Sequence, residues 1–462
     1  MTVSVSHLSA VEMTDLFRRR ELSPVEALAA TLVRIEEVNP KINAIYHVDR
    51  DGALAQAKAS ELRWRDSAPL GWLDGVPTTI KDALETNGLP AHRGSAAGSG
   101  VVHSSDHPTV ARMRNSGAVI VGKNTMCDYG ILAAGVSSYH GVTRNPWNLS
   151  KTTGASSSGA SASVCAGIEP VSIGTDIVGS IRIPASYCGL AGHKPSYGRV
   201  PYYFQGSPVL VAGPLARSIT DVALHMNVLT AADARDFSAL PRDGVDYIAE
   251  LDRFDPAGKR ALVITELGIG EPVAEDVANA IVRAGETLRG QGVHVDRLET
   301  VPFERGEWEP AELFYMVRTL SELSQHPDAE QRKTPVIYDW TRRALNLNAL
   351  DHHANFVATQ RLRERTFNLI DDYDFLILPS TPDTAFDAEQ PGSDPTRLFE
   401  SWANTFLFNL TEQPGSNVPM GLDRNGLPIG VQIIGQRYDD VGVLGLSHVL
   451  EQAVGRLTPP KL

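Results

Sequence analysis

The stretch Ser150-Lys-Thr-Thr-Gly-Ala-Ser-Ser-Ser-Gly-Ala-Ser-Ala-Ser163 is where the composition of this chain shifts most sharply, toward small and hydroxylated residues. It lies between a turn-like Asn145-Pro-Trp-Asn148 and the apolar start of a predicted helix at Val164. A connection between elements is usually about 2–6 residues long, and longer loops inside compact domains are often functional. We therefore expect a functional loop whose small residues let backbone approach closely, with a flexible tether as the alternative.

Short apolar runs on both sides of this stretch predict buried strands, and helical stretches separate several of them. This alternation is typical of the α/β class. The chain is therefore expected to form a large mixed, mostly parallel central sheet covered by helices on both faces. The expected strands cover residues 119–121, 171–173, 261–264, 375–378 and 429–434, and the expected helices cover 273–288 and 441–454.

Two further helices are predicted near the start of the chain. Ser9-x-x-Glu12 and Ser23-Pro24-Val25-Glu26 both fit the capping box, the second with proline at the first helical position. The second helix is expected to end near Asn39-Pro40, because proline does not continue a helix.

The chain is expected to divide into three segments. Residues 1–70 form an N-terminal helical segment that packs on the core, and residues 71–230 form the core that carries the reactive residues. Residues 231–462 complete the same α/β domain, with a more variable peripheral lobe at about 231–350, where charge and proline-bearing turns are more frequent.

Composition excludes several classes of protein. The 462 residues are 42% hydrophobic and 21% charged, which is ordinary for a globular chain. The net charge, 42 − 55 = −13, gives no cationic surface for a phosphate backbone, so a nucleic-acid partner is not expected. No run of 18 apolar residues and no signal-peptide pattern occurs, so we expect a cytoplasmic protein without a membrane partner.

Common motifs for binding phosphate or metal and for serine hydrolases are incomplete or absent in this sequence. Gly117-Ala-Val-Ile-Val-Gly122-Lys123-Asn124 resembles a phosphate-binding loop, but its apolar middle predicts a strand and asparagine replaces the Mg²⁺-binding hydroxyl. HExxH, GxSxG and SxxK are absent, and Cys127, Cys165 and Cys188 are far apart. No metal and no cofactor are therefore expected.

A lone lysine ends the strand-like segment Gly75-Val-Pro-Thr-Thr-Ile-Lys81-Asp82. Such a lysine usually extends its amine to solvent. If it is buried instead, desolvation would lower its pKa from ~10.4 toward ~7–8 and make it a usable base.

Together these segments resemble the amidase signature family of Ser–Ser–Lys hydrolases. The resemblance spans most of the chain in family order, and the serine-rich loop with the following GSIRIPA segment is its most specific part. The segments concerned are GVPTTIKD at 75–82, GKNT at 122–125, NPWN at 145–148, GASSSGAS at 154–161, GTDIVGSIRIPA at 174–185, GPLARSITD at 213–221 and NLTEQPGSNVPMGLDRNGLPIGVQ at 409–432.

The resemblance implies specific roles for residues of this chain. Ser180 corresponds to the nucleophile, Ser156 to the bridging serine, which follows a cis peptide bond from Ala155, and Lys81 to the base. Backbone N–H groups correspond to the oxyanion hole, at Ile177, Val178, Gly179 and Ser180. We interpret Asp176 and Arg182 as a supporting pair that holds the loop, and Ser157, Ser158 and Ser161 as packing or loop hydrogen bonds. A helix N-cap is the structural alternative for Ser180.

Some positions depart from the family pattern. Ala155, Ser158, Val178 and Glu412 stand where glycine is common, and Thr153 stands where proline is common. Because valine does not readily adopt a positive φ, we expect a loop conformation at residue 178 that valine tolerates.

The residue three positions after the nucleophile separates branches of the family. The resemblance implies glutamine there in the glutaminase subunit of the tRNA-dependent amidotransferase and arginine in malonamide-type enzymes, whereas this chain has Ile183. We therefore expect an amidase for a neutral, partly apolar amide or anilide, with esterase activity as a possible addition. The alternatives are a carbamate (urethane) hydrolase, the glutaminase-type component of the amidotransferase, and a non-catalytic scaffold. The expected partner is the small-molecule amide, ester or carbamate, and the expected assembly is a monomer or homodimer.

Overall fold

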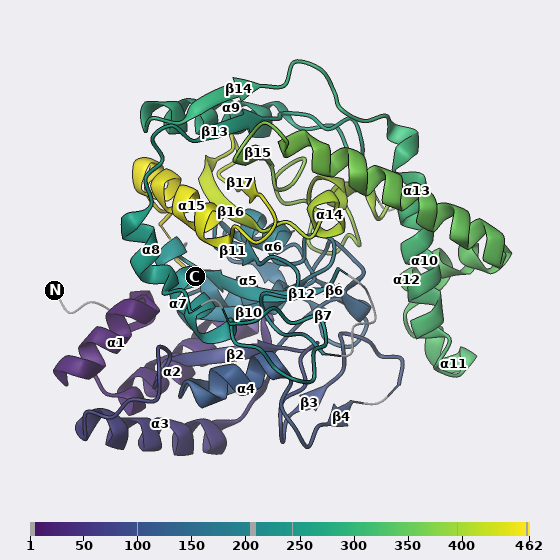
Figure 1. Ribbon diagram of the computed structural model, residues 1–462. Coiled ribbons are helices and arrows are strands. Elements are labelled where there is room, and N and C mark those ends of the chain that lie inside the picture. The colour runs from purple at the N-terminus through teal and green to yellow at the C-terminus, as the bar shows by residue number, and fades with distance from the viewer. Residues whose placement is uncertain (1–4, 99, 204–208, 243, 395, 459–460) are drawn as a thin grey trace.

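A central sheet organises the computed structural model, which describes residues 5–98, 100–203, 209–242, 244–394, 396–458 and 461–462. Among those residues the sheet has eleven strands, drawn through the middle of Figure 1. In spatial order they are β1 (Ile45–Val48), β5 (Val119–Asn124), β2 (Pro77–Lys81), β10 (Val171–Asp176), β12 (Val211–Ala216), β11 (Ala191–Lys194), β16 (Gly415–Leu422), β17 (Pro428–Gly435), β15 (Phe375–Pro379), β13 (Arg260–Val263) and β14 (His294–Arg297). Three small hairpins pair β3 (Pro90–Ala91) with β4 (Val101–Val102), β6 (Val136–Ser137) with β7 (Gly141–Val142), and β8 (Arg144–Asn145) with β9 (Asn148–Thr152).

The prediction of a large mixed sheet in an α/β fold is confirmed, and all five predicted strands belong to it. Parallel pairs form two groups, β5–β2–β10 and β15–β13–β14. The other six adjacent pairs of the described sheet are antiparallel, so parallel pairing is less frequent than expected. A physical reason is visible at β16 and β17, where the short turn 423–427 returns the chain directly and so imposes antiparallel pairing.

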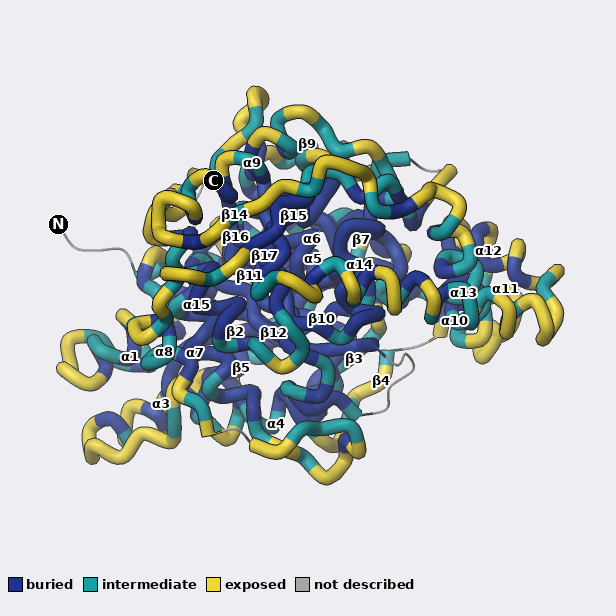
Figure 2. Tube along the Cα trace, turned by 45° about the horizontal axis from the view of Figure 1, so that its top comes forward, coloured by how far each residue is buried: buried dark blue, intermediate teal, exposed yellow. Residues whose placement is uncertain are grey.

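Helices cover both faces of the sheet. One face carries α4 (Pro108–Asn115), α7 (Ile219–Leu229), α9 (Glu275–Gly290) and α15 (Asp440–Val454), over which α1 (Ala10–Arg19) and α8 (Tyr247–Arg253) pack. The other face carries α2 (Pro24–Ile42), α3 (Arg50–Arg65), α5 (Ser158–Cys165), α6 (Arg182–Cys188) and α14 (Ala403–Leu410). Both faces of the strands are therefore buried, as the dark tube through the centre of Figure 2 shows.

A group of helices extends to one side of the sheet in Figure 1. They are α10 (Glu309–Leu323), α11 (Asp328–Gln331), α12 (Pro335–Arg342) and α13 (Ala349–Phe367). In this helical lobe, α10, α12 and α13 share a hydrophobic cluster with α14 and with the loop after β10, so the lobe packs against the part of the molecule that holds the candidate site.

The N-terminal capping boxes are confirmed. The hydroxyl of Ser9 accepts from Glu12 N while the Glu12 carboxylate accepts from Ser9 N, and Ser23 and Glu26 repeat the arrangement. The predicted end of α2 near Pro40 is wrong, because the helix continues to Ile42. Proline so close to the C-terminus removes only one intrahelical hydrogen bond.

The serine-rich stretch is partly helical, since α5 begins at Ser158 rather than at Val164. The predicted close approach of backbone is confirmed: a Cβ added to Gly159 would lie 2.3 Å from both Ala44 O and Thr125 N. Residues 152–166 are all buried, which excludes the flexible tether.

Candidate active site

The parallel strands β2 and β10 bring the candidate residues to one edge of the sheet. Lys81 is the last residue of β2 and Asp176 is the last residue of β10, and carboxyl ends of adjacent parallel strands meet at the same edge. The loop before α5 carries Ser156 to this edge, and the loop after β10 carries Ser180. The structure thus gathers segments that are about a hundred residues apart in the chain.

The amine of Lys81 is fully buried among hydroxyl groups. Its Nζ lies 2.8 Å from Ser156 Oγ, 2.9 Å from Ser157 Oγ and 2.8 Å from Thr175 Oγ1, donating to all three when charged. Burial lowers the pKa of Lys81 to about 7, against weaker opposing effects of Cys127, Asp176 and Asp82. In a large fraction of the molecules this amine is therefore neutral at pH 7 and can accept a proton from one of its hydroxyl neighbours.

Ser156 follows a cis peptide bond from Ala155, as the family resemblance implied. Gly130 packs against its hydroxyl: a Cβ at position 130 would lie 3.1 Å from Ser156 Oγ, and Gly130 has a φ of +74°. Glycine at this position leaves the Ser156 hydroxyl room beside Lys81.

Ser180 is held next to this pair through its backbone. The N–H of Ser157 donates to the Ser180 carbonyl oxygen at 3.3 Å. Within the described part of the chain, no hydrogen bond joins Ser180 Oγ to Ser156 Oγ. Catalytic hydrogen bonds are often long or poorly aligned before substrate binds, and rotation of one side chain changes this distance.

Of the four backbone N–H groups expected to form the oxyanion hole in the loop 177–180, three are free to do so. Gly179 N donates to Asp176 Oδ1 at 2.8 Å, so this N–H is engaged. The N–H groups of Ile177, Val178 and Ser180 have no acceptor among the described backbone and side-chain hydrogen bonds. These three donors are the ones that remain for a substrate oxygen.

The positive φ of this loop falls on Gly179, at +118°, and not on Val178. The expectation that Val178 adopts a conformation valine tolerates is therefore confirmed. Thr405 packs against the loop and donates its hydroxyl to Val178 O at 2.6 Å. A Cβ at Gly179 would lie 2.1 Å from Thr405 Oγ1, so this contact requires glycine.

Asp176 and Arg182 form the buried pair that the sequence suggested, with Nε and Nη2 each 3.1 Å from the carboxylate. Arg182 also donates to Gln432 Oε1 at 3.0 Å and to Asn409 Oδ1 at 2.6 Å. Burial alone would raise the pKa of Asp176, but Arg182, helped by Lys194 and Asn409, outweighs this effect and holds the pKa at about 2. This carboxylate stays charged and fixes the loop through Gly179 and Ile181.

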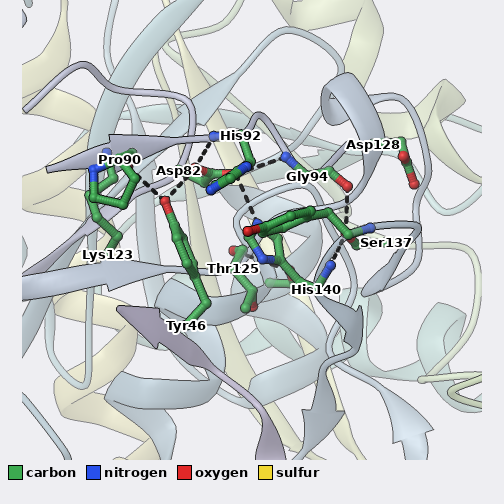
Figure 3. A network of polar contacts seen from close by, with 12 residues as sticks. Tyr46, Asp82, Pro90, His92, Gly94, Lys123, Thr125, Asp128, Ser137 and His140 are labelled. Atoms are coloured by element: carbon green, nitrogen blue, oxygen red, sulfur yellow. Dashed lines mark hydrogen bonds and ion pairs between the residues drawn. The ribbon is translucent and has the colours of Figure 1, made fainter. Parts of the chain in front are cut away.

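A second buried carboxylate, Asp82, directly follows Lys81 at the end of β2 and lies in a network of polar contacts (Figure 3). Burial opposes its ionisation, but His140, Lys123 and Tyr46 together outweigh this effect and lower the pKa of Asp82 to about 2. Asp82 thereby ties the end of β2 to β1, to the loop after β3 and to the turn between β6 and β7. Its partners are Tyr46 Oη at 2.6 Å, His92 N at 2.8 Å, Gly94 N at 2.7 Å and His140 Nε2 at 2.9 Å.

Sequence reasoning missed several of these contacts. The sequence predicts only packing or loop hydrogen bonds for Ser157, yet its hydroxyl contacts the Lys81 amine, and so does the hydroxyl of Thr175. Asn409 and Gln432 lie in the late segment 409–432 that contributed to the family resemblance, which was the available signal. Nothing in the sequence indicates that His140 pairs with Asp82.

The Amidase family model matches residues 26–444, and the chain therefore belongs to the amidase signature family. The chain is 32% identical to the glutamyl-tRNA(Gln) amidotransferase A-type subunit of Solidesulfovibrio magneticus, covering 99% of both chains. Its fold is similar to that of a bacterial aryl acylamidase of this family, with a TM-score of 0.89, 28% identity and 96% of each chain covered. It is also similar to 6-aminohexanoate cyclic dimer hydrolase, with a TM-score of 0.87, 26% identity and 98% of each chain covered.

Across the residues that the structure describes, none of the helices has the length and apolar character needed to cross a membrane.

Proposed function

We propose that this protein hydrolyses the C–N bond of a neutral, partly apolar amide or anilide through an acyl-enzyme on Ser180. The observation that carries the proposal is the contact of 2.8 Å between Lys81 Nζ and Ser156 Oγ, made by an amine whose pKa burial lowers to about 7. A base must be neutral at the working pH to accept a proton, and this lysine meets that requirement.

The proposed reaction is a proton relay. Neutral Lys81 takes the Ser156 hydroxyl proton, Ser156 takes the Ser180 proton, and Ser180 Oγ bonds to the substrate carbonyl carbon. The negative charge moves to the carbonyl oxygen, where the N–H groups of Ile177, Val178 and Ser180 stabilise it. Gly179 N–H supports this loop through Asp176 instead.

Collapse of the tetrahedral intermediate returns a proton through Ser156 to the leaving nitrogen as the C–N bond breaks. An amide needs this proton, because an amide anion is a very poor leaving group. Water then loses its proton to the same relay and attacks the acyl carbon. The carboxylic acid product leaves and Ser180 regains its proton.

The substrate class rests on apolar surroundings. Ile183 occupies the position three residues after Ser180, and it packs in one cluster with Ala155, Val178, Tyr129 and aromatic side chains of the helical lobe. These side chains would surround a neutral, apolar acyl group, and the structural similarity to an aryl acylamidase supports an apolar substrate. Esters and carbamates present the same carbonyl carbon, so esterase activity and carbamate hydrolysis are variants of this proposal.

The sequence comparisons favour a second candidate, the glutaminase-type component of a tRNA-dependent amidotransferase, because relatives of 32% and 33% identity carry that amidotransferase's name. Ile183 argues against this candidate, because the family resemblance implies glutamine at that position in the glutaminase subunit.

Hydrolysis of free glutamine, measured beside a panel of anilides, amides, esters and carbamates, separates the two candidate functions. Faster turnover of an apolar anilide supports our proposal, and faster turnover of glutamine supports the second candidate. Either activity fits a cytoplasmic enzyme.

Covalent labelling tests the nucleophile. Incubation with a fluorophosphonate should add one adduct mass, located on Ser180 by peptide mass spectrometry, and Ser180→Ala should remain unlabelled. Ser161→Ala, which changes a buried serine whose hydroxyl donates to Ser158 O within α5, is the matched control and should label normally. A wild-type protein that acquires no label would indicate a non-catalytic scaffold.

A further inference from the structure

A cavity of about 650 Å³ has walls that do not include Lys81, Ser156 or Ser180. Its walls come from β9, the start of α9, the loop that follows β15 and the turn between β16 and β17, and Tyr187 at the end of α6 contributes as well. None of the described residues to which we assign catalysis lines it. We call it the acidic pocket, for the carboxylates that line it, Glu271, Glu275, Asp276, Asp383 and Asp423.

Three of these carboxylates are not matched by a cation. Arg424 lines the pocket but is bound to Asp276 by two hydrogen bonds of 2.8 Å, and Lys151 is bound at 2.8 Å to Asp387, which does not line the pocket. Among the described ion pairs, none includes Glu271, Asp383 or Asp423. The pocket therefore holds an excess of negative charge that a bound cation would offset.

Tyr187 supplies an independent indication of a ligand. Its side chain is buried, with 2% of the residue exposed, and its hydroxyl has no partner among the described hydrogen bonds. Burial first, and then the charges of Glu271 and Asp383, raise the pKa of Tyr187, so the phenol stays neutral. Because Tyr187 lines the pocket, a ligand donor there would give this oxygen a hydrogen-bond partner.

Polar residues Asn148, Thr384, Ser393 and Asn425 also line the pocket, and one side of it is apolar. Phe386 packs edge-to-face on Tyr187 with ring centroids 6.1 Å apart, and Ala274, Ala385 and Leu427 complete this side. The described residues contain no cluster of three or more side chains suited to hold a metal ion. A ligand with a positive charge and an aliphatic body would match both the carboxylates and this apolar side.

We propose that the acidic pocket binds an organic ammonium compound, its cationic nitrogen between Glu271, Asp383 and Tyr187 Oη and its aliphatic stem against Phe386 and Leu427. This site is separate from the proposed function, since it uses none of the relay residues and needs no turnover.

Calorimetric titration with hexylammonium tests the proposal, with 1-hexanol as the neutral probe of the same shape. At low ionic strength, hexylammonium should bind at least about tenfold more tightly than hexanol. Added salt should weaken the binding of hexylammonium. Asp383→Asn, a change at an exposed side chain, should weaken hexylammonium about tenfold, and Tyr187→Phe should weaken it severalfold.

Glu286→Gln removes an equal charge from an exposed position of α9 outside the pocket and should leave binding unchanged. Equal affinities for hexylammonium and hexanol would overturn the proposal. So would unchanged affinity in both Asp383→Asn and Tyr187→Phe when circular dichroism shows that these variants are folded. Because the readout is binding, loss of the proposed amidase activity would leave this test intact.

Discussion

The backbone N–H of Ser157 donates to the carbonyl oxygen of Ser180 at 3.3 Å, and this one bond joins the serine-rich loop to the loop after β10. The side chain of Ser157 also lies 2.9 Å from Lys81 Nζ. Ser157 therefore links the segments of the three residues proposed for the relay, Lys81, Ser156 and Ser180, through its backbone N–H and its hydroxyl. The proposed relay requires in addition that the Ser156 and Ser180 hydroxyls come within hydrogen-bonding distance of each other.

Replacing Lys81 should lower kcat/KM more for amide substrates than for ester substrates. Lys81→Met keeps the buried volume but removes the base, so kcat/KM for an anilide should fall by about 10²–10⁴-fold. The matching ester should lose less, because an alkoxide leaving group depends less on the returned proton. Steady-state kinetics on an amide and ester with the same acyl group measure this difference, and Lys58→Met, at an exposed site, is the control. An equal loss for both substrates would argue against Lys81 as the source of the leaving-group proton.

The rate should depend on the charge of Lys81. Because burial lowers the pKa of Lys81 to about 7, acidification below this value protonates the base, and kcat/KM should fall about tenfold per pH unit. Above pH about 8, kcat/KM should become independent of pH. Lys194 is also buried with a pKa lowered to about 7, so Lys194→Met should keep the same profile if Lys81 is responsible. A flat profile between pH about 5 and 9 is the outcome that contradicts the assignment.

Removing Arg182 should destabilise the fold strongly. Arg182→Met leaves Asp176 buried without its guanidinium, and loss of one partner of a buried ion pair costs about 3–5 kcal/mol. Urea unfolding followed by circular dichroism measures this loss in the free energy of unfolding. Arg283→Met, at an exposed position of α9, should change it by less than about 0.5 kcal/mol. A similarly small change in Arg182→Met would show that the pair does not hold the loop.

Glu412 adopts a backbone conformation suited to glycine, with a φ of +64°. Its carboxylate contacts Arg363 at 3.0 Å and Arg437 at 2.5 Å, contacts that glycine would lose. Because Glu412→Gly and Glu412→Ala lose the same ion pairs, the glycine variant should be more stable than the alanine variant by about 1 kcal/mol. At Glu286, inside α9, the order should reverse, since alanine favours helix over glycine. Thermal unfolding of the four variants measures both differences, and a more stable alanine at position 412 would contradict this interpretation.

Most of the core was predictable because its strands are continuous apolar runs. Residues 375–378 and 429–434 were predicted as strands and form the centres of β15 and β17. The strand β12, of sequence VAGPLA, was missed, because glycine, proline and alanine carry little strand preference and the pairing partners decide its conformation. The early start of α5 was missed because Ser158, Gly159 and Ser161 are weak helix formers that tertiary packing holds in place.

The candidate site was predictable only where sequence motifs specify it. Lys81, Ser156 and Ser180 came from the family resemblance, and the structure brings their segments together. The engagement of Gly179 N–H by Asp176 could not be predicted, since it depends on how the carboxylate is turned by Arg182. The pairing of Asp82 with His140 joins segments 58 residues apart, and sequence gives no rule for such a contact.

The crystal structure of the enzyme labelled with a fluorophosphonate tests the central claim most directly. The account predicts phosphorus bonded to Ser180 Oγ, with Ser156 Oγ within about 3.2 Å of both that oxygen and Lys81 Nζ. The phosphonyl oxygen should accept from N–H groups of Ile177, Val178 or Ser180. A Ser156 hydroxyl that remains more than about 4 Å from Ser180 Oγ in the adduct would contradict the relay.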